Sequence, residues 1–339
     1  MDGSRSDRSE RLAIAGQETD NGERGHAIAG RETDNGERGH AIAGQETDNG
    51  ARAAVRKPEW LKVRISHNKT FHGVRELVNG LNLHTVCEEA ACPNRGECWS
   101  LGTATFLIMG DTCTRSCGFC NVKTGRPLPL DPDEPRRVAE AVRNMKLRYA
   151  VITSVDRDEL PDAGAAHFAE TVHTVRAVNP SCRVEILIPD FKGMEESLAA
   201  VCEAKPDVLA HNMETVARLH LQVRPQAKYW RSLQVLGRAK KRGMVVKSGV
   251  MVGLGETKAE VVQVMRDVVD AGCDLFTIGQ YLRPTPRHLP VVEYVHPDVF
   301  EEYRIMGGKV GLRHVESGAL VRSSYHAASQ EETMRSGGR

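Results

Sequence analysis

The segment ATFLIMGDTCTRSCGFC, residues 104–120, joins a short apolar run directly to three closely spaced cysteines. Its first six residues, ATFLIM, have the apolar and β-branched character of a buried strand, and the glycine and polar residues that follow are typical of a loop. The segment therefore predicts a strand that carries Cys113, Cys117 and Cys120 on the loop at its carboxyl end.

Further runs of the same character follow along the chain: YAVITSV from Tyr149, RVEILIP from Arg183, DVLAHN from Asp207, VVKSGVMV from Val245 and LFTIGQY from Leu275. Segments with helical periodicity lie between them, for example EPRRVAEAVRNM from Glu134, AAHFAETVHTVRAV from Ala165 and KAEVVQVMRDVVDAG from Lys258. Such an alternation requires a parallel sheet with right-handed crossovers. The fold class that we predict is α/β, a partial or complete parallel (β/α) barrel of about six βα units.

Polar residues follow each predicted strand immediately. Besides the cysteine loop, they are Ser154 to Arg157, Pro189 and Asp190, Asn212 to Glu214, Gly253 to Glu256, and Gln280 to Arg283. The carboxyl ends of the strands carry the active site in parallel barrels, so these loops are expected to converge on one rim. The sequence predicts the reaction site at that rim.

Composition excludes several classes of protein. The chain is 40% hydrophobic and 27% charged, with a formal net charge of +1. It has neither an apolar run long enough to span a membrane nor the pattern of a secretory or organelle signal. We therefore expect a cytoplasmic protein that binds neither nucleic acid nor membrane.

Cysteine usage points to metal chemistry. In a reducing compartment the six cysteines of residues 87–120 are expected to be metal ligands or redox groups rather than disulfides. The remaining three, Cys182, Cys202 and Cys273, are scattered among apolar neighbours and are expected to be buried free thiols.

The spacing C-x3-C-x2-C from Cys113 favours an iron–sulfur cluster over zinc. Closed structural zinc takes four ligands, usually as two short pairs. Three thiolates instead suit a 4Fe-4S cluster whose fourth iron stays open to another ligand. A second trio, spaced C-x4-C-x5-C, consists of Cys87, Cys92 and Cys98. By itself this second trio fits a metal-free thiol set, a zinc site that lacks one ligand, or a second cluster.

Residues 13–52 contain a tandem repeat with a period of 14, consisting of two full copies, the first being AIAGQETDNGERGH, and a shorter third copy, AIAGQETDNGAR. Each full copy offers one Ile and two Ala among polar residues, which is too little apolar surface to offset the entropy of ordering. We predict a disordered tail over residues 1–56 that is dispensable for chemistry.

The first trio, with Phe119 directly before its last cysteine, resembles the signature of the radical SAM superfamily, in which the open iron binds S-adenosylmethionine (SAM). The two trios together, joined by GTATFLIMGDTCTR, resemble the lipoyl synthase family. Further segments resemble that family in the same order: ITSVDRDEL (from Ile152), AHNMETV (Ala210), QVRP (Gln222), SGVMVGLGET (Ser248), TIGQYLRPTPRHLPV (Thr277) and LVRSSYHA (Leu320). The resemblance covers the chain from Pro58 to Ala327.

The resemblance implies two 4Fe-4S clusters. A SAM-binding cluster is implied at Cys113, Cys117 and Cys120. An auxiliary cluster, which is taken apart to supply sulfur, is implied at Cys87, Cys92 and Cys98. Ser324 of the RSSY motif is implied as the fourth auxiliary ligand, with Ser323 as the alternative. A serine oxygen is a poorer partner than a thiolate for sulfide-bridged iron, so this iron should be lost first.

The activity implied by the family is the insertion of two sulfur atoms, at carbons six and eight, into an octanoyl chain attached to a lysine of a carrier domain. Two SAM molecules are consumed per product. The implied partners are octanoylated lipoyl carrier domains of 2-oxoacid dehydrogenase complexes, the glycine cleavage H protein, an electron donor such as ferredoxin or flavodoxin, and an iron–sulfur carrier protein.

Rim position and the family resemblance together suggest which residues contact SAM. Asn212 and Glu214 offer amide and carboxylate groups to ribose hydroxyls and to the methionine amine. Arg224 offers a guanidinium fork to the SAM carboxylate. The further candidates are Phe119, Thr153, Ser154, Arg157, Gly253 and Gly255. The alternatives are loop capping for Asn212 and Glu214, a turn for Gly253 and Gly255, and a surface salt bridge for Arg224.

The resemblance also divides the chain. We expect an N-terminal extension with the auxiliary cysteines over residues 57–100, a radical SAM barrel core over 101–295, a C-terminal helix with RSSY over 296–327, and a second disordered tail over 328–339. One departure from the family is Ala163, where glycine is expected. If that position needs positive φ, the alanine is strained.

Three other interpretations remain open on the sequence. A sulfur-inserting radical SAM enzyme of the biotin synthase type is expected to carry its auxiliary ligands on later strands. A two-cluster electron carrier is expected to use four thiols per cluster. A zinc-stabilised binding module is the third.

Overall fold

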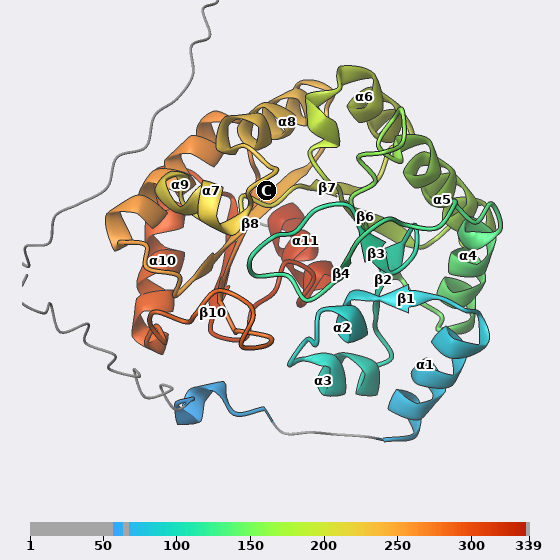
Figure 1. Cartoon of the computed structure of the whole chain (residues 1–339), viewed down its shortest axis with the longest axis horizontal. Helices are drawn as coiled ribbons and strands as arrows, with labels where there is room; N and C mark the ends of the chain where they lie inside the picture. Colours follow the sequence, from blue (N-terminus) through green and yellow to red (C-terminus); the bar gives the residue numbers. More distant parts are fainter. Residues whose placement is uncertain (1–56, 64–67, 337–339) are drawn as a thin grey trace, which may run out of the picture. The chain divides into compact units, whose positions relative to one another are not determined.

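The computed structural model describes residues 57–63 and 68–336, so the repeats and the tail predicted over residues 1–56 lie outside the described residues. One eight-stranded sheet has the order β1-β2-β5-β6-β7-β8-β9-β10. Its strands are β1 His84–Thr85, β2 Thr105–Ile108, β5 Tyr149–Ser154, β6 Arg183–Leu187, β7 Val208–Ala210, β8 Val246–Val252, β9 Leu275–Gln280 and β10 His314–Gly318. The pairing of β1 with β2 is antiparallel and every later pairing is parallel. Among the described residues no pairing joins β1 to β10, so the sheet is an open, partial barrel (Figure 1).

The long helices lie outside the curved sheet in Figure 1. They are α4 Glu134–Asn144, α5 Ala165–Val178, α6 Glu195–Glu203, α8 Tyr229–Lys241, α9 Lys258–Asp270 and α10 Pro297–Val310. Each of these helices buries residues on one side, as α4 does with Val138, Ala139 and Val142. The α/β prediction is confirmed, and all six predicted strands and the three predicted helices are present.

The N-terminal extension forms α1 Lys69–Gly80, α2 Val86–Glu89 and α3 Arg95–Ser100, preceded by the short helix η1 Glu59–Leu61. It is joined to the barrel by β1, whose His84 pairs with Leu107 of β2. Trp99 of α3 is fully buried and packs against Phe71 of α1, with ring centroids 5.2 Å apart. This packing holds the helices that carry the second cysteine trio beside the first strand of the barrel.

The residues after β10 do not form the tail that the sequence predicts over 328–339. They form α11, Ala327–Ser336, which contacts β5, β9 and β10 and lies within the ring of strands in Figure 1. Gln330 and Glu331 are each 1% exposed, and Glu331 pairs with Arg183 at the start of β6. The prediction is wrong for residues 328–336 because α11 is buried through polar groups that find partners, which a hydropathy pattern cannot reveal.

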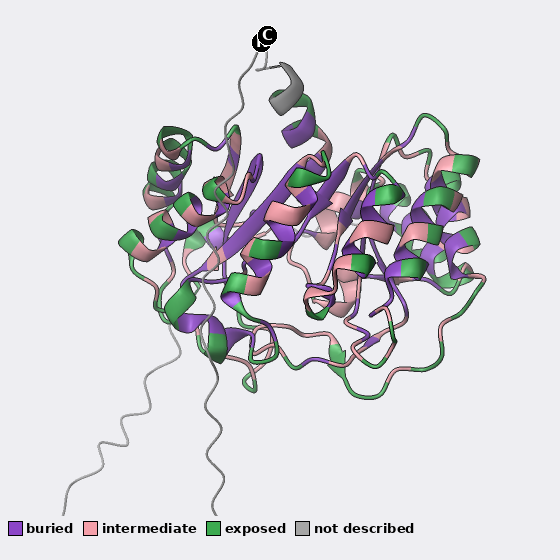
Figure 2. Cartoon of the chain, turned by 90° about the horizontal axis from the view of Figure 1, so that it is seen from above, coloured by how far each residue is buried: buried purple, intermediate pink, exposed green. Residues whose placement is uncertain are grey.

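The strands are buried along most of their length, as Figure 2 shows. The barrel also encloses charge, because Lys247 Nζ lies 2.9 Å from Glu185 Oε1 and neither side chain is more than 1% exposed. The Tyr149 hydroxyl donates to the same carboxylate at 2.7 Å. Each buried charge thus has a charged or hydrogen-bonding partner, which is what keeps such groups tolerable in a core.

The remaining short elements are β3 Thr112–Cys113, β4 Lys123–Thr124, η2 Phe191–Gly193, η3 Ala217–Leu219 and α7 His220–Val223. Across the described part of the chain, no helix combines the length and the apolar character that crossing a membrane requires.

Candidate functional site

The first cysteine loop is fixed from several sides at the rim of the barrel. β3 pairs with β4, and the amide of Gly125 donates to the carbonyl of Cys113 at 3.0 Å. The amide of Gly118 donates to Val223 O at 2.9 Å, and Leu289 N donates to Gly118 O at 3.0 Å. The loop is therefore held between α7 and the segment after β9.

His288 lies at the rim and supports this loop. Its Nε2 is 2.9 Å from the carbonyl of Cys120, and its Nδ1 is 2.9 Å from the Thr285 hydroxyl. A carbonyl only accepts, so Nε2 donates and Nδ1 accepts from Thr285. His288 thus fixes the backbone of the last cysteine.

The three thiols of the loop influence one another electrostatically. Burial raises the pKa of Cys113 and of Cys117 to about 11 and that of Cys120 to about 12. The charges of Cys117 and Cys113 raise the pKa of Cys120 further, whereas Arg224 opposes the rise at Cys117. Without iron these thiols are protonated near neutral pH, so metal binding must displace protons.

An arginine inside the cysteine motif ties the loop to two strand ends. Arg115 is 3% exposed, and its Nε and Nη2 donate to the two carboxylate oxygens of Asp158 at 2.6 and 2.8 Å. Nη2 also donates to Asp190 Oδ1 at 2.6 Å. Burial alone raises the pKa of Asp190, but the Arg115 guanidinium outweighs burial and holds it well below its usual range. Because Asp158 follows β5 and Asp190 follows β6, this clamp fixes the loop against both.

Sequence reasoning missed Arg115 as a functional residue. The sequence did hold a signal for it: Arg115 lies between Cys113 and Cys117, and the next two rim loops carry the acidic residues Asp158 and Asp190. The partners are separated by 43 and 75 positions, so no local pattern pairs them.

Three of the predicted SAM-contacting residues meet beside the cysteine loop. Asn212 Nδ2 donates to Glu214 Oε1 at 3.0 Å, and Arg224 Nη1 donates to Asn212 O at 2.8 Å. Burial raises the pKa of Glu214, and Arg224 opposes that rise. A Cβ on Gly249 would lie 3.4 Å from Asn212 Oδ1 and 2.2 Å from Thr277 Oγ1, so only glycine fits beneath this group.

Unpaired polar atoms also lie at the rim. The Oδ1 atom of Asn212 and the hydroxyl of Ser154 are buried with no hydrogen-bond partner in the described part of the chain. Buried polar atoms are normally satisfied, so these two are free to accept a bound molecule. Arg224 is 8% exposed and thus is not the surface salt-bridge residue that the sequence left as its alternative.

Other candidates are engaged within the protein. Thr153 Oγ1 donates to Leu187 O at 2.8 Å, and Arg157 binds Glu159 at 2.6 Å and the carbonyls of Met109 and Leu128. Phe119 packs at the edge of the core.

The two glycines of GLGE support turns. A Cβ on Gly253 would lie 2.2 Å from Gln280 Nε2 and 2.5 Å from Glu293 O, so the chain after β9 packs directly on this glycine. Gly255 has a φ of +104°, which favours glycine. Contact of Gly253 and Gly255 with SAM stays a prediction.

The strain expected at Ala163 is present. Its φ is +51°, in the left-handed region that alanine rarely adopts. Gly164 follows at +86°, and a Cβ there would lie 2.4 Å from Met109 Sδ. The loop after β5 therefore has two successive residues with positive φ, a conformation that suits glycine, and the first of these residues is an alanine.

The second trio is carried by two short helices and the turn between them. Cys87 lies on α2, Cys98 lies on α3, and Cys92 lies between these helices. Burial raises the pKa of Cys87 to about 11, with a further rise from Cys92. Burial raises the pKa of Cys98 to about 12, with further rises from Cys87 and Cys92. The three thiols of this trio are thus close enough to influence one another electrostatically.

The RSSY segment lies against this second trio. Asn94 Nδ2 donates to the carbonyl of Leu320 at 2.7 Å, and the Tyr325 hydroxyl donates to Glu97 Oε1 at 3.2 Å. Burial lowers the pKa of Arg322, and the charge of Cys92 acts against that lowering. Ser323 and Ser324 lie between these contacts. Three thiols and a serine are donor types that suit the expected auxiliary cluster, and both the cluster and the choice of serine stay predictions.

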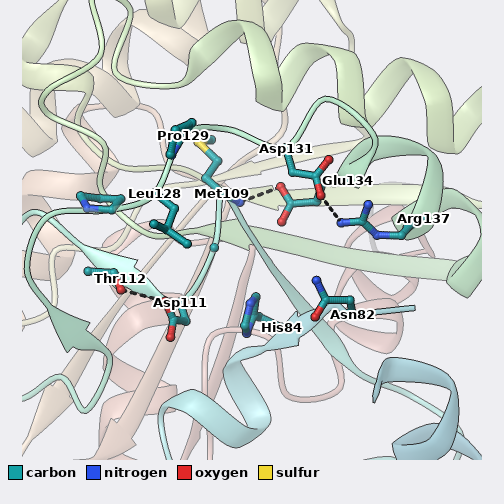
Figure 3. A pocket seen from close by; sticks show the side chains of 12 residues that line it. Asn82, His84, Met109, Asp111, Thr112, Leu128, Pro129, Asp131, Glu134 and Arg137 are labelled. Atoms are coloured by element: carbon teal, nitrogen blue, oxygen red, sulfur yellow. Dashed lines mark hydrogen bonds and ion pairs between the residues drawn. The ribbon is translucent and has the colours of Figure 1, made fainter. Parts of the chain in front are cut away.

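A cavity of about 180 Å³ lies beside the start of the cysteine loop, between β1 and α4 (Figure 3). Its charged groups are already paired, because Glu134 accepts from Met109 N at 2.8 Å and from His167 at 2.7 Å, and Asp131 binds Arg137 at 2.8 Å. These bonds stiffen the end of β2 ahead of the cysteines.

Within the described residues, no three His, Cys, Asp or Glu side chains are placed to share a single metal ion.

Comparison with known proteins decides the family. A model of the radical SAM superfamily matches residues 107–268, and a model of the N-terminal domain of lipoyl synthase matches residues 27–92. A lipoyl synthase of Rubrobacter xylanophilus is 56% identical over 83% of this chain and 88% of its own length. The chain belongs to the lipoyl synthase family. A lipoyl synthase of Phocaeicola vulgatus is 55% identical over 80% of this chain and 96% of its own, and a mitochondrial lipoyl synthase of Nematostella vectensis is 54% identical over 80% and 94%.

Membership of the lipoyl synthase family confirms the predicted family and makes the chain a radical SAM enzyme. The electron carrier and the zinc-stabilised binding module are therefore wrong as interpretations. The fold agrees, because the solved structure of HydG, a maturase of the FeFe-hydrogenase, superposes with a TM-score of 0.52 at 16% identity, covering 68% of this chain and 54% of HydG. A lipoyl synthase family member of this fold is expected to bind SAM and at least one 4Fe-4S cluster.

Proposed function

We propose that this lipoyl synthase family member inserts two sulfur atoms into a protein-bound octanoyl-lysine, with the sulfur supplied from a cluster at the second trio. The observation that carries the proposal is the position of the two trios, one on a loop at the barrel rim and one on α2, α3 and the turn between them, beside the RSSY segment. A biotin synthase type of enzyme is expected to draw its auxiliary ligands from later strands. The position of the second trio favours lipoyl synthesis.

In this proposal Cys113, Cys117 and Cys120 hold the SAM-binding cluster, and Cys87, Cys92, Cys98 and Ser324 hold the auxiliary cluster. When bound, the clusters and SAM supply the hydrogen-abstracting radical and the sulfur. The protein itself orients the reactants and excludes water.

The rim residues bind and orient SAM. The free Oδ1 of Asn212 and the carboxylate of Glu214 accept hydrogen bonds from its hydroxyl and amine groups, and Arg224 stabilises its carboxylate. Because Arg224 already donates to Asn212 O, one guanidinium links the carboxylate site to the hydroxyl site. Thr153, Arg157, Gly253 and Gly255 shape the loops around these groups.

The proposed partners are octanoylated lipoyl carrier domains, a small electron donor such as a ferredoxin or flavodoxin, and an iron–sulfur carrier. The proposed compartment is the cytoplasm. The octanoyl chain must reach both thiol groups, so the carrier lysine is expected to enter at the rim.

The test is an anaerobic assay of the reconstituted protein with SAM, a strong reductant and an octanoyl-lysine peptide. Sulfur gain at the octanoyl chain, measured by peptide mass, together with 5'-deoxyadenosine supports the proposal. If 5'-deoxyadenosine forms but no sulfur is gained, even on an intact octanoylated carrier domain, the radical SAM class stands and the sulfur insertion proposal is wrong.

A further inference from the structure

The C-terminal segment that carries RSSY is bound on both sides by one short stretch of the N-terminal extension. Ahead of the serines, Asn94 donates to Leu320 O at 2.7 Å. Behind them, the Tyr325 hydroxyl lies 3.2 and 3.4 Å from the two carboxylate oxygens of Glu97. The paired residues are 226 and 228 positions apart in the chain, so these contacts close a very long loop.

The second contact lies directly beside two of the proposed ligands. Glu97 precedes Cys98 on α3, and Tyr325 follows Ser324. Neighbouring Cα atoms are about 3.8 Å apart, so a bond between Glu97 and Tyr325 limits how far Ser324 can move from Cys98. His326 adds to this contact, since its ring stacks on Tyr325 with centroids 3.9 Å apart and lies near the Glu97 carboxylate.

α11 fixes the backbone of Tyr325 from the other side. Gln330 Nε2 donates to Tyr325 O at 2.7 Å, and Gln330 N donates to His326 O at 3.1 Å. The next residue, Glu331, pairs with Arg183 at the start of β6. These contacts attach the backbone of Tyr325 to the barrel. They leave the phenol group available for its hydrogen bond to Glu97, next to Cys98 of the auxiliary trio.

We propose that Glu97 and Tyr325 form a latch that positions Ser324 as a ligand of the auxiliary cluster. This inference rests on the proposed function, because it takes the second trio as the auxiliary cluster site. The latch is a positioning device. Neither Glu97 nor Tyr325 touches the reacting atoms, and their hydrogen bond sets how long Ser324 stays at the iron.

The latch is also able to open. The Glu97 side chain is 43% exposed, so water competes for the phenol whenever the bond breaks. When the Glu97–Tyr325 bond breaks, the contact of Asn94 with Leu320 and the helix α11 stay in place. Mainly the residues between Leu320 and α11 are then freed. A serine held in this way leaves its iron more readily than a ligand on a rigid strand.

The test compares the full-length wild-type chain with Tyr325→Phe, Glu97→Ala and the double variant. Amide hydrogen exchange of residues 320–326 in the iron-free protein is expected to rise about fivefold in Tyr325→Phe, the size of one lost net hydrogen bond. After reconstitution with both clusters, release of iron to a chelator is expected to rise by about the same factor. The double variant should match the single variants, because both remove one shared bond.

Tyr229→Phe is the matched control. It removes another tyrosine–carboxylate bond, from Tyr229 to Asp267 at 2.5 Å between α8 and α9, and should change neither readout. Equal exchange of residues 320–326 in Tyr325→Phe and Tyr229→Phe overturns the latch. Faster exchange without faster iron release overturns the positioning of a ligand. If wild type fails to transfer sulfur while iron release still follows the latch, the proposed function is wrong and the latch stands.

Discussion

The two cysteine trios are held in contrasting ways. The first lies on a rim loop of the barrel and is clamped by Arg115, whose side chain is 2% exposed, to carboxylates after two neighbouring strands. The second is enclosed by the N-terminal extension and the C-terminal segment, which meet through contacts at partly exposed residues such as Glu97. A cluster that must keep its geometry over many turnovers benefits from the rigid support. In the proposed function the second cluster gives up sulfur, and a support that opens favours that role.

The largest difference is expected between two arginines, one inside each trio: Arg115 between Cys113 and Cys117, and Arg95 between Cys92 and Cys98. Arg115→Ala leaves the buried carboxylate of Asp190 without its main partner, so we expect a loss of about 3–5 kcal/mol of unfolding free energy and of iron at the first trio. Arg95→Ala removes a half-exposed side chain 3.6 Å from Glu88 and should cost about 1 kcal/mol at most. Urea unfolding and the iron content of both variants provide the check. Equal losses of unfolding free energy and of iron in the two variants would show that the supports of the two trios do not differ in rigidity.

Acid sensitivity should originate on the side of the first trio. His211 is buried, its Nδ1 donates to Ile188 O at 2.9 Å, and its Nε2 accepts from Ser232 at 2.9 Å. Burial lowers its pKa to about 4. Between an unfolded value near 6.5 and that folded value, the unfolded state binds the extra proton, so stability falls as pH falls.

From pH 7 to pH 5 this histidine should account for about 2 kcal/mol of lost unfolding free energy. Urea unfolding at both pH values measures the loss. His211→Gln should remove the share of this histidine and leave that of His220, whose pKa burial also lowers to about 4. A His211→Gln protein with the wild-type loss would contradict the account.

A stronger fourth ligand should slow the loss of iron from the auxiliary site. In Ser324→Cys a thiolate replaces the serine oxygen, so we expect iron release to a chelator to slow by about tenfold and sulfur transfer to slow with it. Ser323→Cys is the matched control and should leave both rates near wild type. Unchanged rates in Ser324→Cys would exclude Ser324 as the ligand.

The smallest effect concerns strain in the loop after β5. Ala163→Gly relieves a φ of +51°, and after the entropy that glycine gains in the unfolded chain we expect a stabilisation of about 0.5–1 kcal/mol. Ala177→Gly, at an exposed position of α5, should instead destabilise. Thermal unfolding of both variants gives the comparison, and stabilisation by neither or by both would show that backbone strain is not the cause.

The barrel was predictable because local patterns determine its parts. Apolar runs such as YAVITSV and periodic segments such as that from Lys258 specify strand and helix within a dozen residues. Polar residues directly after the strands then locate the rim. The strain at Ala163 was predictable as well, because a single departure from the family's glycine pattern suffices to raise it.

The supports of the two trios were not predictable from local patterns. Each of these supports joins segments that are distant in the sequence. Arg115 binds carboxylates on later loops, Asn94 donates a hydrogen bond to Leu320, and Tyr325 donates one to Glu97. α11 was missed for the same reason, since its burial depends on Arg183 far away in sequence. Ser324 entered only through the family resemblance, because nothing in its local sequence distinguishes it from a solvated serine.

The central claim is that the two trios have separate duties, and one measurement tests it directly. Wild type, Cys92→Ala and Cys117→Ala are reconstituted anaerobically and given SAM, reductant and an octanoyl-lysine peptide, and 5'-deoxyadenosine and peptide mass are followed. We expect Cys92→Ala to form 5'-deoxyadenosine without sulfur gain and Cys117→Ala to form neither product. Sulfur gain at the wild-type level in Cys92→Ala, or loss of 5'-deoxyadenosine while its first trio is fully loaded with iron, would contradict the account.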